Sequence, residues 1–307
     1  MIQLLAPRPG LLSEASSRFY RESHKGLTCT TVEPCKWIRK SFMRILSPRL
    51  DLTEFFHRIP AVKERVLMLD YDGTLAPFQV RPERALPYPG VANALEELVS
   101  DRGTRVVIVS GRRAEDLASL LPLAKRPEIW GGHGWERLLP SGEHRTQEPK
   151  PGTRQALEQA AHSAQEFLVR SGARVERKPA SIALHWRGLP ALAVAKIQQR
   201  VQAAWSPLAK AGELELLAFD GGIELRATGC NKQHAVKAVL SETCGDSAVA
   251  YLGDDITDED AFAAIKPRGI AVLVRPEYRD TSADVWIRPP RELLSFIKRW
   301  RVKGRRA

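Results

Sequence analysis

The sequence predicts an α/β protein: a doubly wound sheet with helices on both faces, and a smaller α+β domain inserted into it. Three observations support this fold class. Short apolar runs alternate with amphipathic segments along most of the 307 residues, as expected for strands buried on both faces of a parallel sheet. Polar residues follow directly after these runs, at the strand ends where open α/β sheets bind ligands. Residues 144–221 break the alternation and define the insertion.

The strands of the doubly wound sheet are predicted from four apolar runs, at residues 65–69, 105–110, 247–253 and 269–274. Around these runs, apolar residues recur at helical spacing over residues 89–100, 114–121 and 257–265. Asp51 is placed to cap a short helix that ends near residue 59. We therefore expect order to begin near residue 51.

The insertion reads in the order α-β-β-α-β. Its predicted helices cover residues 153–170 and 189–210, and its strands cover residues 174–178, 181–186 and 214–219. The polar/apolar alternation of these strands is typical of a sheet with one solvated face. The chain is accordingly divided into a core of residues 51–143 and 222–300, the insertion at 144–221, and basic ends at 1–50 and 301–307.

The net charge of +11 belongs to the two ends of the chain. Residues 1–60 hold ten Lys and Arg against five acids, residues 298–307 hold six and none, and the remainder carries 31 of each sign. A neutral globular body disfavours nucleic-acid binding as the main function, although weak attraction of the ends to RNA or an acidic surface stays open.

Residues 1–50 show no sustained hydrophobic period, so we expect a poorly ordered extension, with Met43 as an alternative start. Its acids argue against an organelle transit segment, and no secretory leader or membrane-spanning run is apparent. The four cysteines are irregularly spaced, which disfavours a disulfide framework or zinc site and favours the cytoplasm.

Two carboxylates, Asp70 and Asp72, follow the first buried strand. Both face one pocket if the chain turns, and Gly73 permits the turn. Oxygen ligands of this kind suit Mg²⁺. On its own, however, an Asp-x-Asp-Gly sequence is more often a turn than a site.

Two further elements offer contacts to a phosphate. Ser110-Gly111-Arg112 ends the second strand, where a hydroxyl and a flexible backbone can cradle phosphate, although Ser110 is equally suited to capping the next helix. Lys232 precedes a helix and can bridge phosphate and carboxylate, although a solvated surface lysine is the commoner outcome.

The strongest single signal is the acidic segment that follows the strand at residues 247–253. Five of its seven residues from Asp254 to Asp260 are acids. Helix capping accounts for one or two of them, and a nearby cation is the simpler explanation for the rest.

Taken in order, these four elements resemble the motifs of the haloacid dehalogenase (HAD) superfamily of aspartate-nucleophile phosphatases. The resemblance implies a Rossmann-like core with a cap domain, and an aspartyl-phosphate intermediate. It implies Mg²⁺ held by Asp70, Asp72 and Asp254. It further implies Asp70 as nucleophile, Asp72 as general acid/base and Lys232 and Ser110 as phosphate contacts, with Asp255 and Asp258 supporting the ligands from behind.

Further motifs narrow the resemblance to the trehalose-6-phosphate phosphatase family, over about residues 60–300. They are DYDGTLAP at 70–77, SGR at 110–112, GHGWE at 132–136, ERKPAS at 176–181, HWR at 185–187, GIELR at 222–226 and GDDITDE at 253–259. In that family the insertion is a cap that closes over the core and reads the sugar. The resemblance implies phosphate or substrate contacts from Thr74, Ser110, Gly111, Arg112, His133, Glu176, Lys178, Arg187 and Glu224.

Each cap contact also has an ordinary interpretation. Glu176 and Lys178 share one face of a strand and can form a surface pair of little energetic value. His133, between two glycines, is as well suited to a structural role. The chain departs from the family pattern at Ala227, where Pro is common, and at Gln233, where Gly is common, and neither position supplies a reacting group.

The function implied is Mg²⁺-dependent hydrolysis of trehalose 6-phosphate to trehalose and phosphate, the last step of trehalose biosynthesis. A phosphatase for another sugar phosphate (glucosylglycerol phosphate or sucrose phosphate), a phosphomutase and a non-catalytic binding module stay as alternatives. The absence of a Walker-type glycine loop argues against a kinase. The expected partner is a small sugar phosphate rather than a membrane or nucleic acid, and the sequence leaves the oligomeric state open.

Overall fold

The computed structural model describes residues 43–302, except residues 102, 169–170, 212, 220 and 230. The basic extension up to residue 42 and the tail from residue 303 therefore lie outside the described residues. Within the described part of the chain, no helix combines the length and the apolar character needed to cross a membrane.

A nine-stranded sheet forms the core, in the order β1-β13-β12-β11-β2-β3-β4-β5-β6. The strands from β13 to β4 run parallel, and β1, β5 and β6 pair antiparallel at the two edges. The bounds are β1 Arg44–Ile45, β2 Glu64–Leu69, β3 Thr104–Val109, β4 Glu128–Gly131, β5 Glu136–Leu138, β6 His144–Thr146, β11 Ser247–Gly253, β12 Ile270–Val274 and β13 Val285–Ile287.

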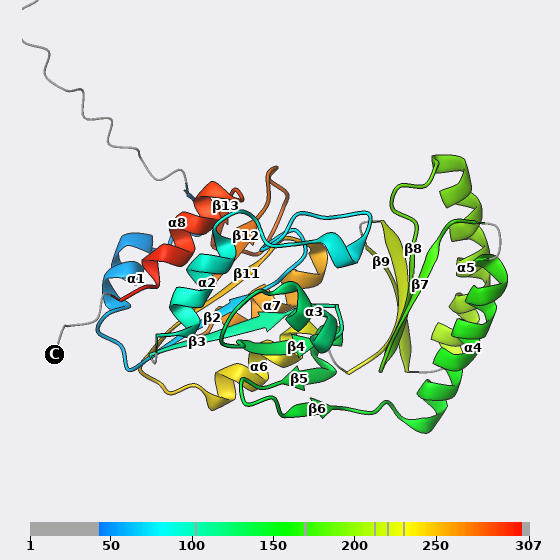
Figure 1. Cartoon of the computed structure of the whole chain (residues 1–307), viewed down its shortest axis with the longest axis horizontal. Coiled ribbons are helices and arrows are strands. Elements are labelled where there is room, and N and C mark those ends of the chain that lie inside the picture. Colours follow the sequence, from blue (N-terminus) through cyan, green and yellow to red (C-terminus); the bar gives the residue numbers. More distant parts are fainter. Residues whose placement is uncertain are drawn as a thin grey trace, which may run out of the picture. The chain divides into compact units, whose positions relative to one another are not determined.

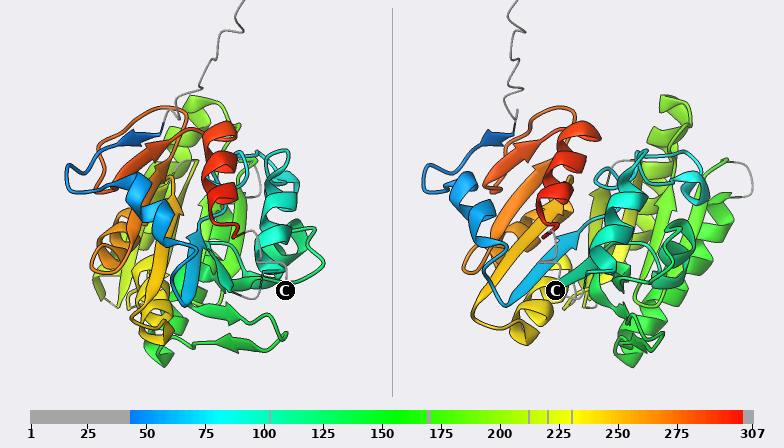
Figure 2. Two further views of the ribbon diagram at one scale, coloured as in Figure 1. Left: turned by 90° about the vertical axis from the view of Figure 1, so that its left-hand side faces the viewer. Right: turned by 60° about the vertical axis from the view of Figure 1, so that its left-hand side comes forward.

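Helices cover both faces of this sheet, which confirms the predicted fold class (Figures 1 and 2). Successive residues of a strand point to opposite faces: Leu67 and Leu69 of β2 pack in one apolar layer, and Val66 and Met68 pack in the other. The first layer holds α1 Leu52–Arg58, α2 Val91–Val99, α3 Ala114–Leu120 and α8 Arg291–Arg299, and the second holds α6 Lys232–Glu242 and α7 Glu259–Ile265. Three short 3₁₀ turns, η1 Pro82–Arg84, η2 Gly132–Gly134 and η3 Ile256–Asp258, lie in the connections.

The second sheet has four antiparallel strands in the order β7-β8-β10-β9. Its strands are β7 Arg174–Lys178, β8 Ser181–His185, β9 Leu214–Phe219 and β10 Gly222–Ala227, and its helices are α4 Pro151–Leu168 and α5 Ala191–Ala211. The two helices pack on one face of the sheet (Figure 1), around the fully buried Trp205. The other face is left to carry polar side chains. These elements together are called the cap below.

Sheet membership corrects the predicted boundaries at three places. β6 pairs with β5, so the core runs past residue 143. β10 pairs with β8 and β9, so the cap runs to residue 227 rather than 221. β1 pairs with β13, so order begins before residue 51. In each case backbone pairing decides the boundary: with the preceding strand for β6, with β8 and β9 for β10, and with a strand far away in sequence for β1.

Candidate active site

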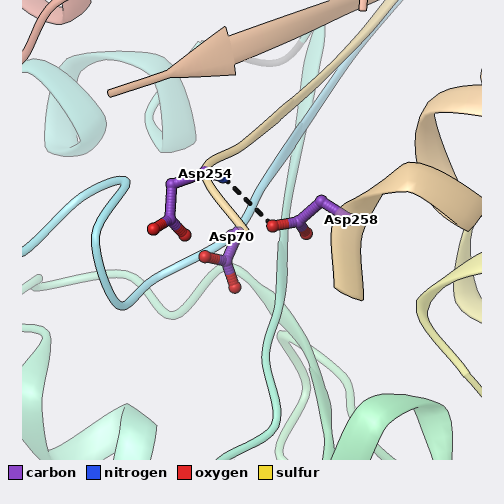
Figure 3. A group of neighbouring side chains, drawn as sticks. All are labelled: Asp70, Asp254 and Asp258. Carbon is purple, nitrogen blue, oxygen red and sulfur yellow. Dashed lines mark hydrogen bonds between the residues drawn. The ribbon is translucent and has the colours of Figure 1, made fainter. Parts of the chain in front are cut away.

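Three buried aspartates gather where the parallel strands end. Asp70 follows β2 and Asp254 follows β11, and these strands are neighbours in the sheet. Asp258 lies in the turn η3 that follows. One carboxylate oxygen from each residue lies within 4.8 Å of the other two (Figure 3), and all three side chains are buried.

Asp258 is fully engaged by the chain itself. Its Oδ1 accepts hydrogen bonds from the Lys232 ammonium at 2.7 Å and from the Tyr251 hydroxyl at 2.6 Å. Its Oδ2 accepts the backbone N–H groups of Asp254 at 3.1 Å and Asp255 at 3.0 Å. Since four donors already surround it, Asp258 is suited to orienting its neighbours rather than to binding a ligand.

Lys232 joins Asp70 to Asp258. It is the first residue of α6, after the N-cap Asn231, and its buried ammonium lies 2.7 Å from an oxygen of each carboxylate. Burial alone would lower the pKa of Lys232, but the two carboxylates outweigh it and hold that pKa above its ordinary value. Burial raises the pKa of Asp70 to about 7, although Lys232 acts in the opposite direction.

The remaining oxygens suit a small divalent cation. Asp254 Oδ1 is buried and has no hydrogen-bond partner among the described residues. Burial, with Asp70 and Asp258 nearby, raises the pKa of Asp254 well above its ordinary value. Such an arrangement of oxygen donors fits Mg²⁺, whose charge would return both carboxyls to the ionised form. Asp70 and Asp254 are the residues able to hold it.

Gly73 makes this packing possible. Its backbone is in the left-handed region at φ 83°, and a Cβ there would lie 2.1 Å from Asp254 Oδ2. Any side chain would therefore push Asp254 out of the site, which explains why glycine follows the two aspartates of this loop.

Asp72 is placed differently from its predicted metal role. Both of its carboxylate oxygens accept 2.6 Å hydrogen bonds from the Arg112 guanidinium, which also donates to the Pro82 carbonyl. The Asp72 side chain lies beside the three-aspartate cluster in the same pocket but is not a member of it. The carboxylate cluster therefore contains Asp258 where the sequence predicted Asp72.

Ser110, in the loop after β3, does not cap the helix that follows it. Ser110 Oγ accepts the N–H of Arg112 at 3.2 Å and makes no bond to α3. The N–H of Ala114, at the start of α3, bonds instead to the buried Glu136 carboxylate at 2.8 Å. Gly111 is required here because a Cβ would lie 2.5 Å from His133 Nε2.

Glu224 of β10 is the centre of a buried network in the cap. Its Oε1 accepts from Lys178 at 2.9 Å and from the Ser181 hydroxyl at 2.7 Å. Its Oε2 lies 3.1 Å from His133 Nε2, which joins the cap to the core. Burial alone would raise the pKa of Glu224, but Lys178 and His133 hold it well below its ordinary value. Lys178 is thus a buried partner of Glu224 and not half of a surface pair.

His133 itself is held in a strained conformation. Its φ of 59° is left-handed, which costs a residue with a side chain about 1–3 kcal/mol. Its Nδ1 is buried and has no partner among the described residues. Burial lowers the pKa of His133 despite the nearby Glu224, so the ring is neutral near pH 7. Strain and an unpaired buried nitrogen together are typical of functional positions.

Glu176 is positioned by His185, which belongs to the HWR motif but for which no role was predicted. His185 Nε2 lies 2.7 Å from Glu176 Oε2, and the His185 ring packs edge-on against Phe219 at 5.2 Å. The Arg187 guanidinium lies over the ring of Phe78, at 4.7 Å from its centroid, and so connects the cap to the loop after β2. The alternation of β8, with His185 on the face opposite Leu184, was the available signal.

One pocket collects almost all of the predicted residues. Thirteen of them line it, namely Asp70, Asp72, Ser110, Gly111, Arg112, His133, Glu176, Lys178, Arg187, Glu224, Lys232, Asp254 and Asp255. Thr74 and Asp258 are buried behind it, and Thr74 Oγ1 has no hydrogen-bond partner among the described residues. The pocket adds residues that were not predicted, among them Phe78, Gln79, Pro82, His185, Phe219 and Arg226.

The fold and this arrangement together define a class of protein. A phosphatase of the haloalkanoate (HAD) superfamily from Bacteroides thetaiotaomicron superposes on the chain with a TM-score of 0.50 at 18% identity, covering 77% of this chain and 95% of that one. The C-terminal domain of the trehalose-6-phosphate phosphatase of C. albicans superposes with a TM-score of 0.69 at 21% identity, covering 83% and 98%. The chain has the HAD fold, with a core and a cap.

Sequence similarity is more specific. The trehalose-phosphatase family model matches residues 68–285. The trehalose-phosphate phosphatase of Mycobacterium ulcerans (strain Agy99) is 32% identical over 252 residues, which cover 78% of this chain and 62% of that protein. The chain belongs to the trehalose-phosphatase family. It matches about three fifths of the length of this relative.

Proposed function

We propose that the chain hydrolyses trehalose 6-phosphate to trehalose and inorganic phosphate, with Mg²⁺ as cofactor and through an aspartyl-phosphate on Asp70. The observation that carries the proposal is the pocket itself. Its core wall holds the Asp70–Lys232 pair and Asp254, and its cap wall holds buried polar groups suited to sugar hydroxyls. The trehalose-phosphate phosphatases among its relatives support the choice of sugar.

In the first step, an Asp70 oxygen attacks the phosphorus while the bond from phosphorus to the sugar oxygen breaks. Protonated Asp72 gives its proton to the departing oxygen, so trehalose leaves as a neutral alcohol. Lys232 and Ser110 bind the phosphoryl oxygens. Asp70 and Asp254 would hold Mg²⁺, which would neutralise charge on the phosphoryl group.

In the second step, a water molecule attacks the phosphorus of the aspartyl-phosphate. Asp72, now a carboxylate, takes the proton from that water, and the bond from phosphorus to Asp70 breaks. Asp70 is regenerated and phosphate leaves. Two displacements at phosphorus thus replace one difficult displacement.

Arg112 is expected to move from Asp72 to the substrate phosphate before the first step. In this structure both Asp72 oxygens accept hydrogen bonds from the Arg112 guanidinium, so neither is available to the leaving group. We expect the substrate phosphate to draw Arg112 away from Asp72, because a dianion competes for the same donors. Asp72 can then take up a proton from solvent and give it to the leaving group.

The cap is proposed to recognise the sugar. Glu176, Lys178 and Glu224 are ionised or charge-paired groups on the pocket face of the small sheet. Hydrogen bonds from charged groups to hydroxyls are strong and directional. They are therefore suited to distinguishing one disaccharide phosphate from another.

Phosphate release from a panel of substrates tests the proposal. The panel contains trehalose 6-phosphate, sucrose 6-phosphate, glucosylglycerol phosphate and glucose 6-phosphate. We expect the highest kcat/KM for trehalose 6-phosphate, loss of activity in EDTA, and recovery with Mg²⁺ but not with the larger Ca²⁺. A preference for another sugar phosphate overturns the substrate assignment, and conversion to an isomer without phosphate release indicates a mutase.

A further inference from the structure

The loop that carries Asp254 is held from behind by two arginines that no part of the mechanism uses. Arg275 Nη1 and Arg279 Nε both donate to the Asp254 carbonyl, each at 3.3 Å. Arg279 Nη2 also donates to the Asp255 carbonyl at 2.7 Å. Both arginines come from the segment between β12 and β13, far away in sequence.

Arg279 is itself fixed to the start of α7. Its Nη1 donates to the Glu259 carboxylate, with which it forms an ion pair, and to its neighbouring Asp280 carbonyl at 2.8 Å. Glu259 accepts three more hydrogen bonds, from Thr281 Oγ1 and from the N–H and hydroxyl of Ser282, at 2.7–2.8 Å. Glu259 thus fastens the Arg279 segment to the same helix that continues from the Asp254 loop.

This bracing has two consequences for Asp254. Because its carbonyl already accepts two guanidinium groups, only its carboxylate remains for a ligand. The peptide between Asp254 and Asp255 cannot rotate without breaking three bonds, namely the two guanidinium bonds to the Asp254 carbonyl and the bond from the Asp255 N–H to Asp258. Arg279 also holds the next peptide through the Asp255 carbonyl. The Asp254 carboxylate, with its unpaired Oδ1, is therefore held close to the carboxylate of Asp70.

The bracing also accounts for acids that the sequence analysis assigned to a cation. Glu259 is neutralised by Arg279, Asp260 accepts from Asn231 at 2.9 Å, and Asp258 is paired with Lys232. Asp255 accepts the N–H of Ile256, and of these five acids only Asp254 has a buried carboxylate oxygen without a hydrogen-bond partner among the described residues.

We infer that Arg279, anchored by Glu259, is a positioning residue for the Mg²⁺ site, and that it acts through the backbone of Asp254 and Asp255. The inference rests on the metal site of the proposed function, and it is independent of which sugar phosphate the protein takes. Groups that orient metal ligands from outside commonly contribute 10–100-fold to metal affinity. Arg279 contacts no reacting atom, so its removal should weaken metal binding before it alters the chemistry.

Calorimetric titration of the EDTA-treated protein with MgCl₂, without substrate, measures this directly. Arg279→Met should weaken Mg²⁺ binding by about 10–100-fold. Arg268→Met is the matched control: Arg268 also donates to backbone carbonyls, those of Leu240 at 2.6 Å and Thr243 at 3.1 Å, but it precedes β12 at the opposite end of the strands. It should bind Mg²⁺ as the wild type does, at a comparable loss of thermal stability.

Glu259→Gln provides a second route that leaves the arginine in place. It should weaken Mg²⁺ binding by less than Arg279→Met, since the amide keeps some of the hydrogen bonds but loses the charge. It also covers the case in which Arg279→Met does not fold. Unchanged Mg²⁺ affinity in Arg279→Met and Glu259→Gln, or equal losses in the Arg268→Met control, overturns the inference. A wild type that binds no Mg²⁺ overturns the metal site of the proposed function instead.

Discussion

At the scale of single residues, the site depends on one buried cation among several buried anions. Lys232 has only 4% of its side chain exposed, and its two carboxylate partners are equally buried. A buried ion pair is retained at little net gain, but breaking one leaves an uncompensated charge in the interior. Asp70, the proposed nucleophile, and Asp258 are therefore coupled through this lysine.

Replacing Lys232 should consequently cost both stability and activity. We expect Lys232→Met to lower the free energy of unfolding by about 3–5 kcal/mol at pH 8, above the Asp70 pKa of about 7. Urea denaturation measures the difference. Lys237→Met, an exposed lysine on the same helix, should change it by less than about 0.5 kcal/mol. Equal effects of the two substitutions would show that the buried pairing is without consequence.

The chemical identity of the site residues was predictable, but their partners were not. Asp70, Ser110 and Asp254 could be predicted because each ends an apolar run, and the ends of neighbouring parallel strands meet. The pairing of Asp72 with Arg112, of Asp258 with Tyr251 and of Glu176 with His185 could not. Those contacts depend on side-chain direction after folding, and sequence spacing does not record it.

At the scale of elements, the long buried strands were predicted to within two residues, and the short ones were missed. β2, β3, β11 and β12 are continuous apolar runs, whose local pattern is enough. β1, β4, β5, β6 and β13 have only two to four residues each. They exist through pairing with neighbours, so a period of two residues has too little length in which to appear. β10 is six residues long, but the predicted boundary at residue 221 left it in the core.

The pocket face of β7 offers a prediction about recognition. Glu176→Ala should lower kcat/KM for trehalose 6-phosphate by about 10–200-fold, since a hydrogen bond to a charged group contributes roughly 1.5–3 kcal/mol. Hydrolysis of p-nitrophenyl phosphate, which has no sugar to bind, should hardly change. Arg177→Ala, an exposed neighbour on the same strand, is the control. Equal loss with both substrates would place Glu176 in the fold or in the chemistry rather than in recognition.

The lowered pKa of Glu176 predicts that the stability of the protein depends on pH. Burial alone would raise the pKa of Glu176, but Lys178 and the His185 bond lower it from 4.5 to about 2. A carboxyl group whose pKa is lowered by folding stabilises the folded protein, and this stabilisation is fully present above pH 4.5. It amounts to at most about 3 kcal/mol and is lost as the pH falls toward 2. Glu176→Gln should therefore melt below the wild type at pH 7, and the gap should narrow below pH 4.5. A gap that stays constant down to pH 3 would contradict this assignment.

At the scale of the core and cap together, the residues proposed for chemistry and those proposed for recognition line opposite walls of one pocket. The core wall comes from the carboxyl ends of parallel strands, and the cap wall comes from the polar face of an antiparallel sheet. His133 joins the two walls through Glu224. If the core performs the phosphoryl transfer and the cap selects the sugar, as proposed, substitutions in one wall should alter one of these functions and leave the other.

The most direct test of the central claim is to trap the phosphoryl group on Asp70. p-Nitrophenol leaves without needing an acid, whereas hydrolysis of the aspartyl-phosphate needs Asp72 to take a proton from water. Asp72→Asn with Mg²⁺ and p-nitrophenyl phosphate should therefore release about one p-nitrophenol per active site in a burst. Mass spectrometry should then find the phosphoryl group on Asp70. The account is contradicted if that variant shows no burst while the wild type turns over, if the phosphoryl group lies on another residue, or if Asp70→Asn also gives the burst.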